Sequence, residues 1–218
     1  MTQRSDIGWR VVEASFETSA AASDGYPVPG PPEIAVAGRS NVGKSSLLNA
    51  FCGRRGLARV SRTPGRTRLI NFFAVRLRGP GDDLPLRLVD LPGYGFAAAD
   101  RTTRESFGPM VEGYFSQRAT LCGLLLLVDS RRDFGAAEFE LLEYMSKRQL
   151  PALVCATKID KLKASERGLV ARRLAAKLGV PSKDILLTSS QDRIGLGDDA
   201  RAGGLAADIA TLARGTSS

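Results

Sequence analysis

One stretch of this sequence constrains the fold more than any other, because it needs a strand before it and a helix after it. The apolar residues 34–37 pass directly into a full match to the pattern Gly-x-x-x-x-Gly-Lys-Ser/Thr. The matching residues are Gly38, Arg39, Ser40, Asn41, Val42, Gly43, Lys44 and Ser45. Glycines let backbone N–H groups wrap around a phosphate chain, and the positive end of the following helix dipole faces the same place. The stretch therefore predicts a phosphate-binding loop in an α/β chain, in which Lys44 reaches the β and γ phosphates and the Ser45 hydroxyl binds Mg²⁺. The alternative is a chance glycine turn.

The rest of the chain alternates apolar runs of strand length with helical patterns, which is typical of a mostly parallel sheet with helices on both faces. We expect six strands, at residues 34–37, 69–77, 86–89, 121–128, 152–156 and 185–187. We expect helices at residues 44–52, within 101–118, and at 136–148, 165–178 and 204–213. Because residues 78–83 form a hairpin-like turn, one strand of this three-layer α/β fold should run antiparallel. Pro109 should break or restart the second helix.

Composition excludes several kinds of chemistry. The 218 residues contain no histidine, which rules out a Ser-His-Asp relay and His-ligated zinc. The three cysteines, Cys52, Cys122 and Cys155, are too few for a four-thiolate zinc site, and we interpret them as reduced core residues. The start of the chain is polar and the apolar run 121–128 is far shorter than the roughly 20 residues that span a bilayer. We therefore expect a soluble, cytoplasmic protein with no membrane partner.

A second candidate element follows the third expected strand, and it consists of Asp90, Leu91, Pro92 and Gly93. A carboxylate at the end of this strand can hold Mg²⁺ through a water molecule, and the Gly93 amide can sense a γ-phosphate. Asp-x-Pro-Gly is by itself an ordinary turn. Its position one strand away from a phosphate-binding loop favours the functional interpretation.

Two further motifs follow strands and suggest a base-binding site. The first is Thr157, Lys158, Ile159 and Asp160, in which Asp160 can accept hydrogen bonds from guanine N1–H and its exocyclic amine while the Lys158 stem lies along the purine face. Adenine lacks this pair of donors, so a carboxylate here discriminates between the bases. The second is Thr188, Ser189 and Ser190, a polar turn whose amides can meet guanine O6. Charged or polar turns are the alternative for both.

Four strings, taken in order, resemble a known family. They are GRSNVGKSS at 38–46, SRTPGRTRLINFF at 61–73, LVDLPGYG at 88–95 and TKID at 157–160. The chain resembles the EngB (YihA/YsxC) ribosome-biogenesis GTPases, of the TrmE-Era-EngA-EngB-Septin-like class, from about Ala14 to Ser190. Two features depart from the family pattern: residues 198–203 look like extra sequence, and Phe107 stands where a tryptophan is expected.

The resemblance implies a Ras-like, three-layer P-loop GTPase fold and a Mg²⁺-dependent switch in assembly of the large (50S) ribosomal subunit, needed for normal cell division and septation. It implies that the chain binds GTP and GDP as a monomer, with the large subunit or its precursor as partner. The domain boundaries that follow are a lead at 1–32 with a possible short strand, a single GTP-binding domain at 33–214 and a disordered tail at 215–218. The implied switch I residues are Gly65, Arg66, Thr67, Arg68 and Leu69, with Thr67 closing on Mg²⁺ and Asp90 and Ser45 as the other magnesium residues.

The residue after Gly93 is Tyr94, where many GTPases place a glutamine that orients the attacking water. We therefore expect slow intrinsic hydrolysis. Asn41 resembles the asparagine that binds K⁺ in cation-dependent relatives, so we expect K⁺ to stimulate the reaction unless Asn41 only shapes the loop.

The positive charge is also concentrated. The 31 Lys and Arg exceed the 23 Asp and Glu by 31 − 23 = 8, and residues 54–68 contain six arginines and no acid. We expect Arg54, Arg55 and Arg59 to contact RNA phosphates, since nucleotide binding would then order or release a phosphate-binding surface. A second basic cluster at 161–177 is open to interpretation as a solvated face. Two other functions stay open: a GTP/GDP-gated RNA or ribosome-binding module with negligible hydrolysis, and a P-loop ATPase, which Asp160 disfavours.

Overall fold

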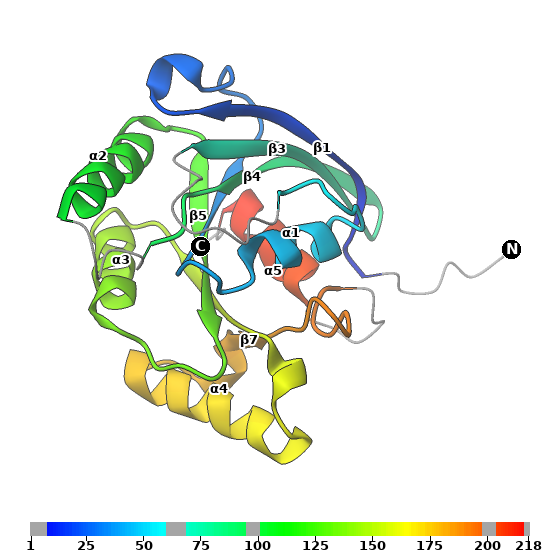
Figure 1. Ribbon diagram of the computed structural model, residues 1–218. Coiled ribbons are helices and arrows are strands. Elements are labelled where there is room, and N and C mark those ends of the chain that lie inside the picture. The colour runs from blue at the N-terminus through cyan, green and yellow to red at the C-terminus, as the bar shows by residue number, and fades with distance from the viewer. Residues whose placement is uncertain (1–7, 60–68, 95–100, 198–203, 216–218) are drawn as a thin grey trace, which may run out of the picture.

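The computed structural model describes residues 8–59, 69–94, 101–197 and 204–215, with side chains left out for residues 101–108. It shows a twisted central sheet with helices packed on both faces (Figure 1). The strands are β1 (Arg10–Ala20), β2 (Glu33–Gly38), β3 (Ile70–Gly79), β4 (Asp82–Asp90), β5 (Leu121–Asp129), β6 (Ala152–Thr157) and β7 (Ile185–Leu187).

The strand order is β1-β3-β4-β2-β5-β6-β7. Strands β4, β2, β5, β6 and β7 pair in parallel, whereas β3 is antiparallel to both of its neighbours, β1 and β4. The predicted fold class, a mostly parallel sheet with one antiparallel strand, is therefore confirmed. The carboxyl ends of β2, β4, β5 and β6 meet at one edge of this sheet, which is where open α/β sheets bind ligands.

The seventh strand, β1, comes from the N-terminal lead, where the sequence predicted at most a short strand. It spans eleven residues and pairs with β3 through two register shifts. Only Ala14 and Ala20 of this edge strand are fully buried. An edge strand that buries so few side chains carries little apolar alternation, which explains why its length was not predicted.

The α-helices lie close to their predicted ranges. They are α1 (Lys44–Phe51), α2 (Arg101–Gln117), α3 (Ala136–Lys147), α4 (Ala164–Leu178) and α5 (Leu205–Arg214), and short 3-10 turns occupy Ser23–Gly25, Ile159–Lys161 and Ser182–Asp184. The prediction that Pro109 breaks the second helix was wrong, because α2 continues through it. Pro109 is exposed and has no backbone N–H, so α2 continues with one hydrogen bond fewer at this turn.

The core has two halves, one on each face of the sheet. Helices α1 and α5 cover one face, and α2, α3 and α4 cover the other. In β2, Ile34 and Val36 join the first half, while Ala35 and Ala37 join the second. This alternation explains the continuous apolar run in the sequence, since a strand covered on both faces has no polar side.

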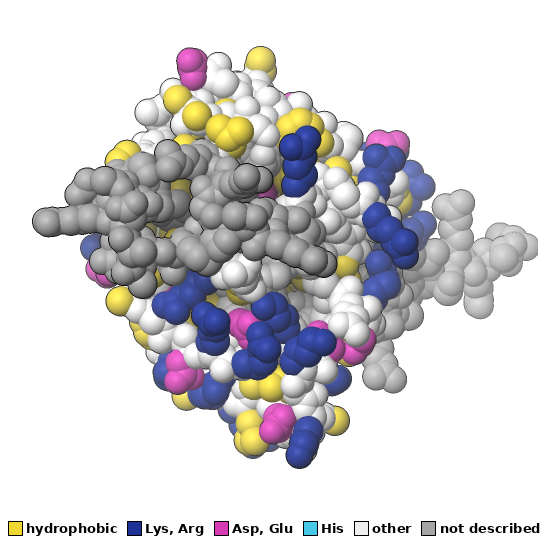
Figure 2. Space-filling model, in the orientation of Figure 1, with side chains coloured by type: hydrophobic (Ala, Val, Ile, Leu, Met, Phe, Trp, Pro, Cys, Tyr) yellow, Lys and Arg dark blue, Asp and Glu magenta, His cyan; other side chains and the backbone are white. Residues whose placement is uncertain are grey.

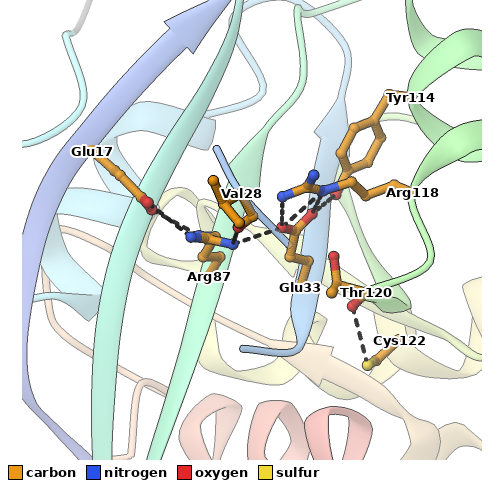
Figure 3. A network of polar contacts seen from close by, with 8 residues as sticks. All are labelled: Glu17, Val28, Glu33, Arg87, Tyr114, Arg118, Thr120 and Cys122. Carbon is orange, nitrogen blue, oxygen red and sulfur yellow. Dashed lines mark hydrogen bonds and ion pairs between the residues drawn. The ribbon is translucent and has the colours of Figure 1, made fainter. Parts of the chain in front are cut away.

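A buried network of ion pairs and hydrogen bonds connects the N-terminal strands to the end of α2 (Figure 3). Glu33 is fully buried and accepts from Arg118 Nη2 at 2.6 Å, from Arg118 Nε at 2.8 Å and from the Tyr114 hydroxyl at 3.0 Å. Arg87 Nη1 lies 3.3 Å from the same carboxylate, and Arg87 also forms two hydrogen bonds with Glu17 of β1. Thus Glu33 joins β2 to β4 and to the end of α2, and Arg87 extends the network to β1 through Glu17.

Among the described residues, no helix is both long and apolar enough to cross a membrane.

Candidate nucleotide-binding site

The predicted phosphate loop lies between the end of β2 and the start of α1. Gly43 precedes the first residue of α1 in the left-handed conformation, with φ of 104°, and Asn41 is also left-handed, with φ of 63°. Because the first turn of an α-helix leaves its N–H groups without partners inside the helix, the amides of Lys44 and Ser45 are available at this end. Gly43 has no side chain to cap them, so the helix end is open to an anion.

Two motifs that lie far apart in the sequence meet in this site. The ammonium group of Lys44 forms an ion pair with Asp90 at the end of β4, and both side chains are largely buried. The second carboxylate oxygen of Asp90 lies 3.4 Å from Nδ2 of Asn71 on β3. Asn71 was not among the predicted site residues; the signal for it was a polar side chain within the otherwise apolar run 69–75.

Mg²⁺ fits the donors that this arrangement provides. The Ser45 hydroxyl and the Asp90 carboxylate are oxygen ligands, which Mg²⁺ prefers. The part of the chain that the structure describes has no cluster of three or more His, Cys, Asp or Glu residues that would form a metal cage. Mg²⁺ usually binds through one or two protein oxygens, substrate phosphates and water.

The third motif, residues 157–160, is hydrogen-bonded directly to the phosphate loop. Thr157 at the end of β6 is buried, and its hydroxyl donates to the carbonyl oxygen of Val42 at 2.7 Å. Lys158 has a left-handed backbone with φ of 62°, and its Nζ donates to the carbonyl oxygen of Asn41 at 2.5 Å. These two contacts place the predicted base-binding residues beside the predicted phosphate-binding residues.

The fourth motif packs against the third. Ser189 is fully buried, and its hydroxyl donates to Asp160 at 2.8 Å, while the Ile159 N–H donates to the Thr188 carbonyl at 3.3 Å. Burial raises the pKa of Asp160, but the hydrogen bonds from Ser189 and Lys161 outweigh it, and the net pKa is lowered. Asp160 is therefore an ionised acceptor at neutral pH, as recognition of two N–H donors requires.

Sequence reasoning missed Asp129, the last residue of β5. Its carboxylate is buried and accepts from Lys158 Nζ at 3.0 Å and from Arg131 at 2.7 and 2.9 Å. Burial raises its pKa, but the hydrogen bonds from Arg131 and Lys158 outweigh it and hold the pKa well below its usual range. A charged residue at the carboxyl end of a buried parallel strand was the signal for this position.

For other predicted residues the structure gives only the degree of burial, and some lie outside the described residues. Leu91 and Pro92 are buried, Gly93, Ser40, Ser45 and Ser190 are partly buried, and Leu69 is exposed. The predicted switch I residues Gly65, Arg66, Thr67 and Arg68 lie outside the described residues, as do residues 198–203, most of the tail at 215–218 and the side chain of Phe107.

The loop that follows α1 presents the predicted RNA-contact residues. The Asn49 side chain pairs with the backbone of Ala58, with Nδ2 to oxygen at 2.9 Å and N–H to Oδ1 at 2.7 Å. This closes the loop, and Arg54, Arg55 and Arg59 are exposed on it. Within the described part of the chain, none of these three arginines takes part in an ion pair.

The second basic cluster, at residues 161–177, differs because several of its cations form ion pairs with acidic residues. Figure 2 shows Lys and Arg side chains gathered on the lower half of the face toward the viewer, with acidic side chains among them. Arg173 and Lys177 of α4 both lie within ion-pair distance of Asp133, at 3.3 and 3.6 Å, and Lys161 lies 3.2 Å from Asp160. Its charge is thus partly balanced within the protein, which favours the interpretation of a solvated face.

Known proteins resemble this chain over most of its length. The model of a family described as 50S ribosome-binding GTPase matches residues 33–158. A probable GTP-binding protein EngB from Pelotomaculum thermopropionicum is 44% identical over 183 residues, which cover 84% of this chain and 89% of the relative. This chain belongs to the EngB family. The resemblance drawn from the four strings is confirmed, and the protein is a GTP-binding, GTP-hydrolysing enzyme.

Other EngB relatives and solved structures agree. The EngB protein of Lactobacillus gasseri is 42% identical over 81% of this chain and 87% of its own length. The crystal structure of a probable GTP-binding protein EngB has a TM-score of 0.60 at 23% identity, covering 84% of this chain and 98% of its own. A variant of the Era protein of Aquifex aeolicus, bound to GDP and AlF₄⁻, has a TM-score of 0.59 at 22% identity over 75% of this chain and 52% of its own. These two structures support the EngB fold.

Proposed function

We propose that this EngB protein is a cytoplasmic, Mg²⁺-dependent GTP switch that acts in assembly of the large ribosomal subunit, and thereby supports normal cell division. The observation that carries the proposal is the match of residues 33–158 to a family described as a 50S ribosome-binding GTPase. The exposed, unbalanced arginines on the loop after α1 add to it, because RNA phosphates are the natural partners of such a surface. We further propose that residues 33–214 form one GTP-binding domain and that the protein is a monomer.

The proposed roles of the residues follow from their motifs and, for the described residues, also from their positions. The amides of the phosphate loop and Lys44 hold the β and γ phosphates, Asp160 with Lys158 binds the guanine, and the Thr188–Ser190 turn meets guanine O6. Ser45, Thr67 and Asp90 would hold Mg²⁺, which neutralises charge on the phosphates when it is bound. The reaction is an in-line attack of water on the γ-phosphate, with catalysis by positioning and electrostatics.

Slow intrinsic hydrolysis is part of the proposal. Tyr94 is partly buried, and burial together with the neighbouring Glu138 carboxylate raises its pKa far above its usual value. A neutral phenol held in this way cannot orient water as a glutamine amide does. This observation also favours the second candidate, a GTP/GDP-gated ribosome-binding module whose hydrolysis is incidental.

Multiple-turnover GTPase assays with and without 50S particles separate the switch from the module. Stimulation of GTP hydrolysis by the particles supports the switch, and unchanged slow turnover supports the module.

Potassium is expected to stimulate GTP hydrolysis through Asn41. The ion would occupy roughly the place of an arginine finger, so we expect a clearly faster rate in KCl than in NaCl at equal ionic strength, and no such difference in Asn41→Ala. The left-handed backbone of Asn41 supports the competing role, because asparagine tolerates this conformation better than most residues. Equal rates in the two salts would assign Asn41 to loop shaping alone.

Replacing Arg54, Arg55 and Arg59 together with alanine is expected to weaken binding to 50S particles and to flatten its salt dependence. Each phosphate contact contributes a slope of about 0.7–0.9 in log affinity against log salt, so three lost contacts reduce the slope by about two to three. Co-sedimentation at several KCl concentrations measures both quantities.

The matched control removes the same charge from another surface. Lys163, Arg172 and Lys183 are exposed on or near α4, and their triple alanine variant has the same net charge as the first. We expect its binding and its salt slope to resemble those of the wild type. If the two variants lose binding equally, general charge rather than the loop after α1 governs the interaction.

A further inference from the structure

A set of backbone contacts joins the phosphate loop to the predicted switch II, the segment that begins with Asp90, Leu91, Pro92 and Gly93 and continues into Tyr94. Arg39 and Tyr94 form a parallel β-bridge outside the named strands. The Ser40 N–H donates to the Tyr94 carbonyl at 2.8 Å, and the Tyr94 N–H donates to the Gly38 carbonyl at 3.4 Å. The residue that follows Gly93 is therefore aligned with the first half of the phosphate loop.

Gly93 itself lies very close to that loop. A Cβ atom added to Gly93 would be 3.0 Å from Ser40 Oγ and 3.2 Å from the Ser40 Cα and N atoms. The Ser40 hydroxyl also donates to the Gly93 carbonyl at 3.3 Å. Since these contacts leave no room for a side chain, the position of Gly93 depends on the position of the backbone at Arg39 and Ser40.

The side chain of Arg39 is held by the first turn of α3. Arg39 Nε lies 2.7 Å from Glu138 Oε1, and Nη2 lies 3.2 Å from Oε2, a bidentate pair. The Glu138 side chain is only 3% exposed, and its Oε2 also accepts from the Gly135 N–H at 2.7 Å. The carboxylate thus binds α3 and the phosphate loop at the same time.

Tyr94 completes the arrangement, because its phenol lies beside the same carboxylate. Its backbone pairs with Arg39, and its side chain adjoins Glu138, which in turn holds the Arg39 guanidinium. We name these three residues the Arg39 clamp: Arg39, Tyr94 and Glu138. Each of the three comes from a different segment, namely the phosphate loop, switch II and α3.

We propose that Glu138 is a positioning residue for GTP recognition, which holds Gly93 in register with the phosphate loop through Arg39 and Tyr94. The inference rests on the proposed function, in which the Gly93 amide senses the γ-phosphate. GDP has no γ-phosphate, so its affinity does not depend on where Gly93 lies. Helix α3, which contributes no predicted nucleotide ligand, therefore sets the preference for GTP over GDP.

The test is Glu138→Gln, with dissociation constants measured for mant-GDP and mant-GppNHp in the presence of Mg²⁺. Loss of the charged, bidentate pair is expected to weaken mant-GppNHp binding about tenfold, as for one hydrogen bond to a charged group. Binding of mant-GDP should stay within about twofold of the wild-type value. The matched control is Glu143→Gln, which removes an exposed α3 glutamate paired with Lys147 and should change neither constant.

A second variant tests the clamp without removing a charge. A Cβ atom on Gly135 would overlap Arg39 Nη2, the end of a flexible side chain, so Gly135→Ala displaces the guanidinium while the fold can adjust. We expect the same selective loss of mant-GppNHp binding. This variant carries the test if Glu138→Gln does not fold, which circular dichroism reveals.

Two results would overturn the inference alone. One is an equal change of both affinities, which would mean that Glu138 only balances the charge of Arg39 near the phosphates. The other is that neither affinity changes in either folded variant. If the wild type binds mant-GDP and mant-GppNHp with equal affinity, the proposed role of Gly93 fails, and the inference fails with it. This result differs from the two above, so the two kinds of failure are distinguishable.

Discussion

Asp160→Asn is expected to lower the affinity for GDP by about 10²–10³-fold and to create binding of xanthosine diphosphate. The Asp160 side chain is 9% exposed and ionised, so its loss leaves two guanine N–H donors without their charged acceptor. Truncating one partner of such a buried, charged hydrogen bond costs about 2–5 kcal/mol. Xanthine carries an oxygen where guanine carries the exocyclic amine, and the asparagine amide can donate to that oxygen.

Competition against mant-GDP measures both effects. Ser189 should donate to the asparagine oxygen as it does to Asp160, which keeps the side chain in place. Asp184→Asn makes the same chemical change at an exposed position and should leave both affinities unchanged. If Asp160→Asn still prefers guanine over xanthine, another group recognises the base.

Glu33→Ala is expected to lower the free energy of unfolding by about 3–5 kcal/mol, because it leaves Arg118 and Arg87 without their buried partner. Glu33 is fully buried, and the side chains of Arg118 and Arg87 are 6% and 9% exposed. The Tyr114 hydroxyl also loses its acceptor. Urea-induced unfolding followed by circular dichroism measures the change.

The control for this experiment lies on β1. Glu13 forms an ion pair with Arg76, but its side chain is 68% exposed, so Glu13→Ala should cost less than about 1 kcal/mol. If Glu33→Ala proves no more damaging than Glu13→Ala, the network in Figure 3 does not stabilise the fold as we describe.

Most of the fold could be predicted from the sequence because the parallel strands are buried on both faces. The run predicted at 121–128 corresponds to β5 (Leu121–Asp129), and the helix predicted at 136–148 corresponds to α3 (Ala136–Lys147). In these segments local propensity, apolar pattern and burial agree. Strand β1 lacked that signal because it lies at the edge of the sheet.

The candidate site was predictable where a short motif carries a mechanism, and less so where contacts are long-range. The phosphate loop was predicted from its own pattern, and Asp90 and Asp160 from short motifs that follow strands in the expected order. The structure brings these segments together through contacts of Lys44, Thr157 and Lys158. By contrast, Asp129 and Glu138 are ordinary acidic residues in the sequence. Their importance appears only when the sheet places Asp129 beside Lys158, and α3 places Glu138 beside Arg39.

In the function that we propose, nucleotide state controls binding to the large ribosomal subunit through the exposed arginines on the loop after α1. The most direct test is the affinity of the full-length protein for purified 50S particles, with GDP and with a non-hydrolysable GTP analogue, at several KCl concentrations. We predict tighter binding with the GTP analogue and a steep decrease in affinity with salt, because phosphate contacts release counterions. Equal affinity in the two nucleotide states, or binding that does not respond to salt, would contradict the proposed switch.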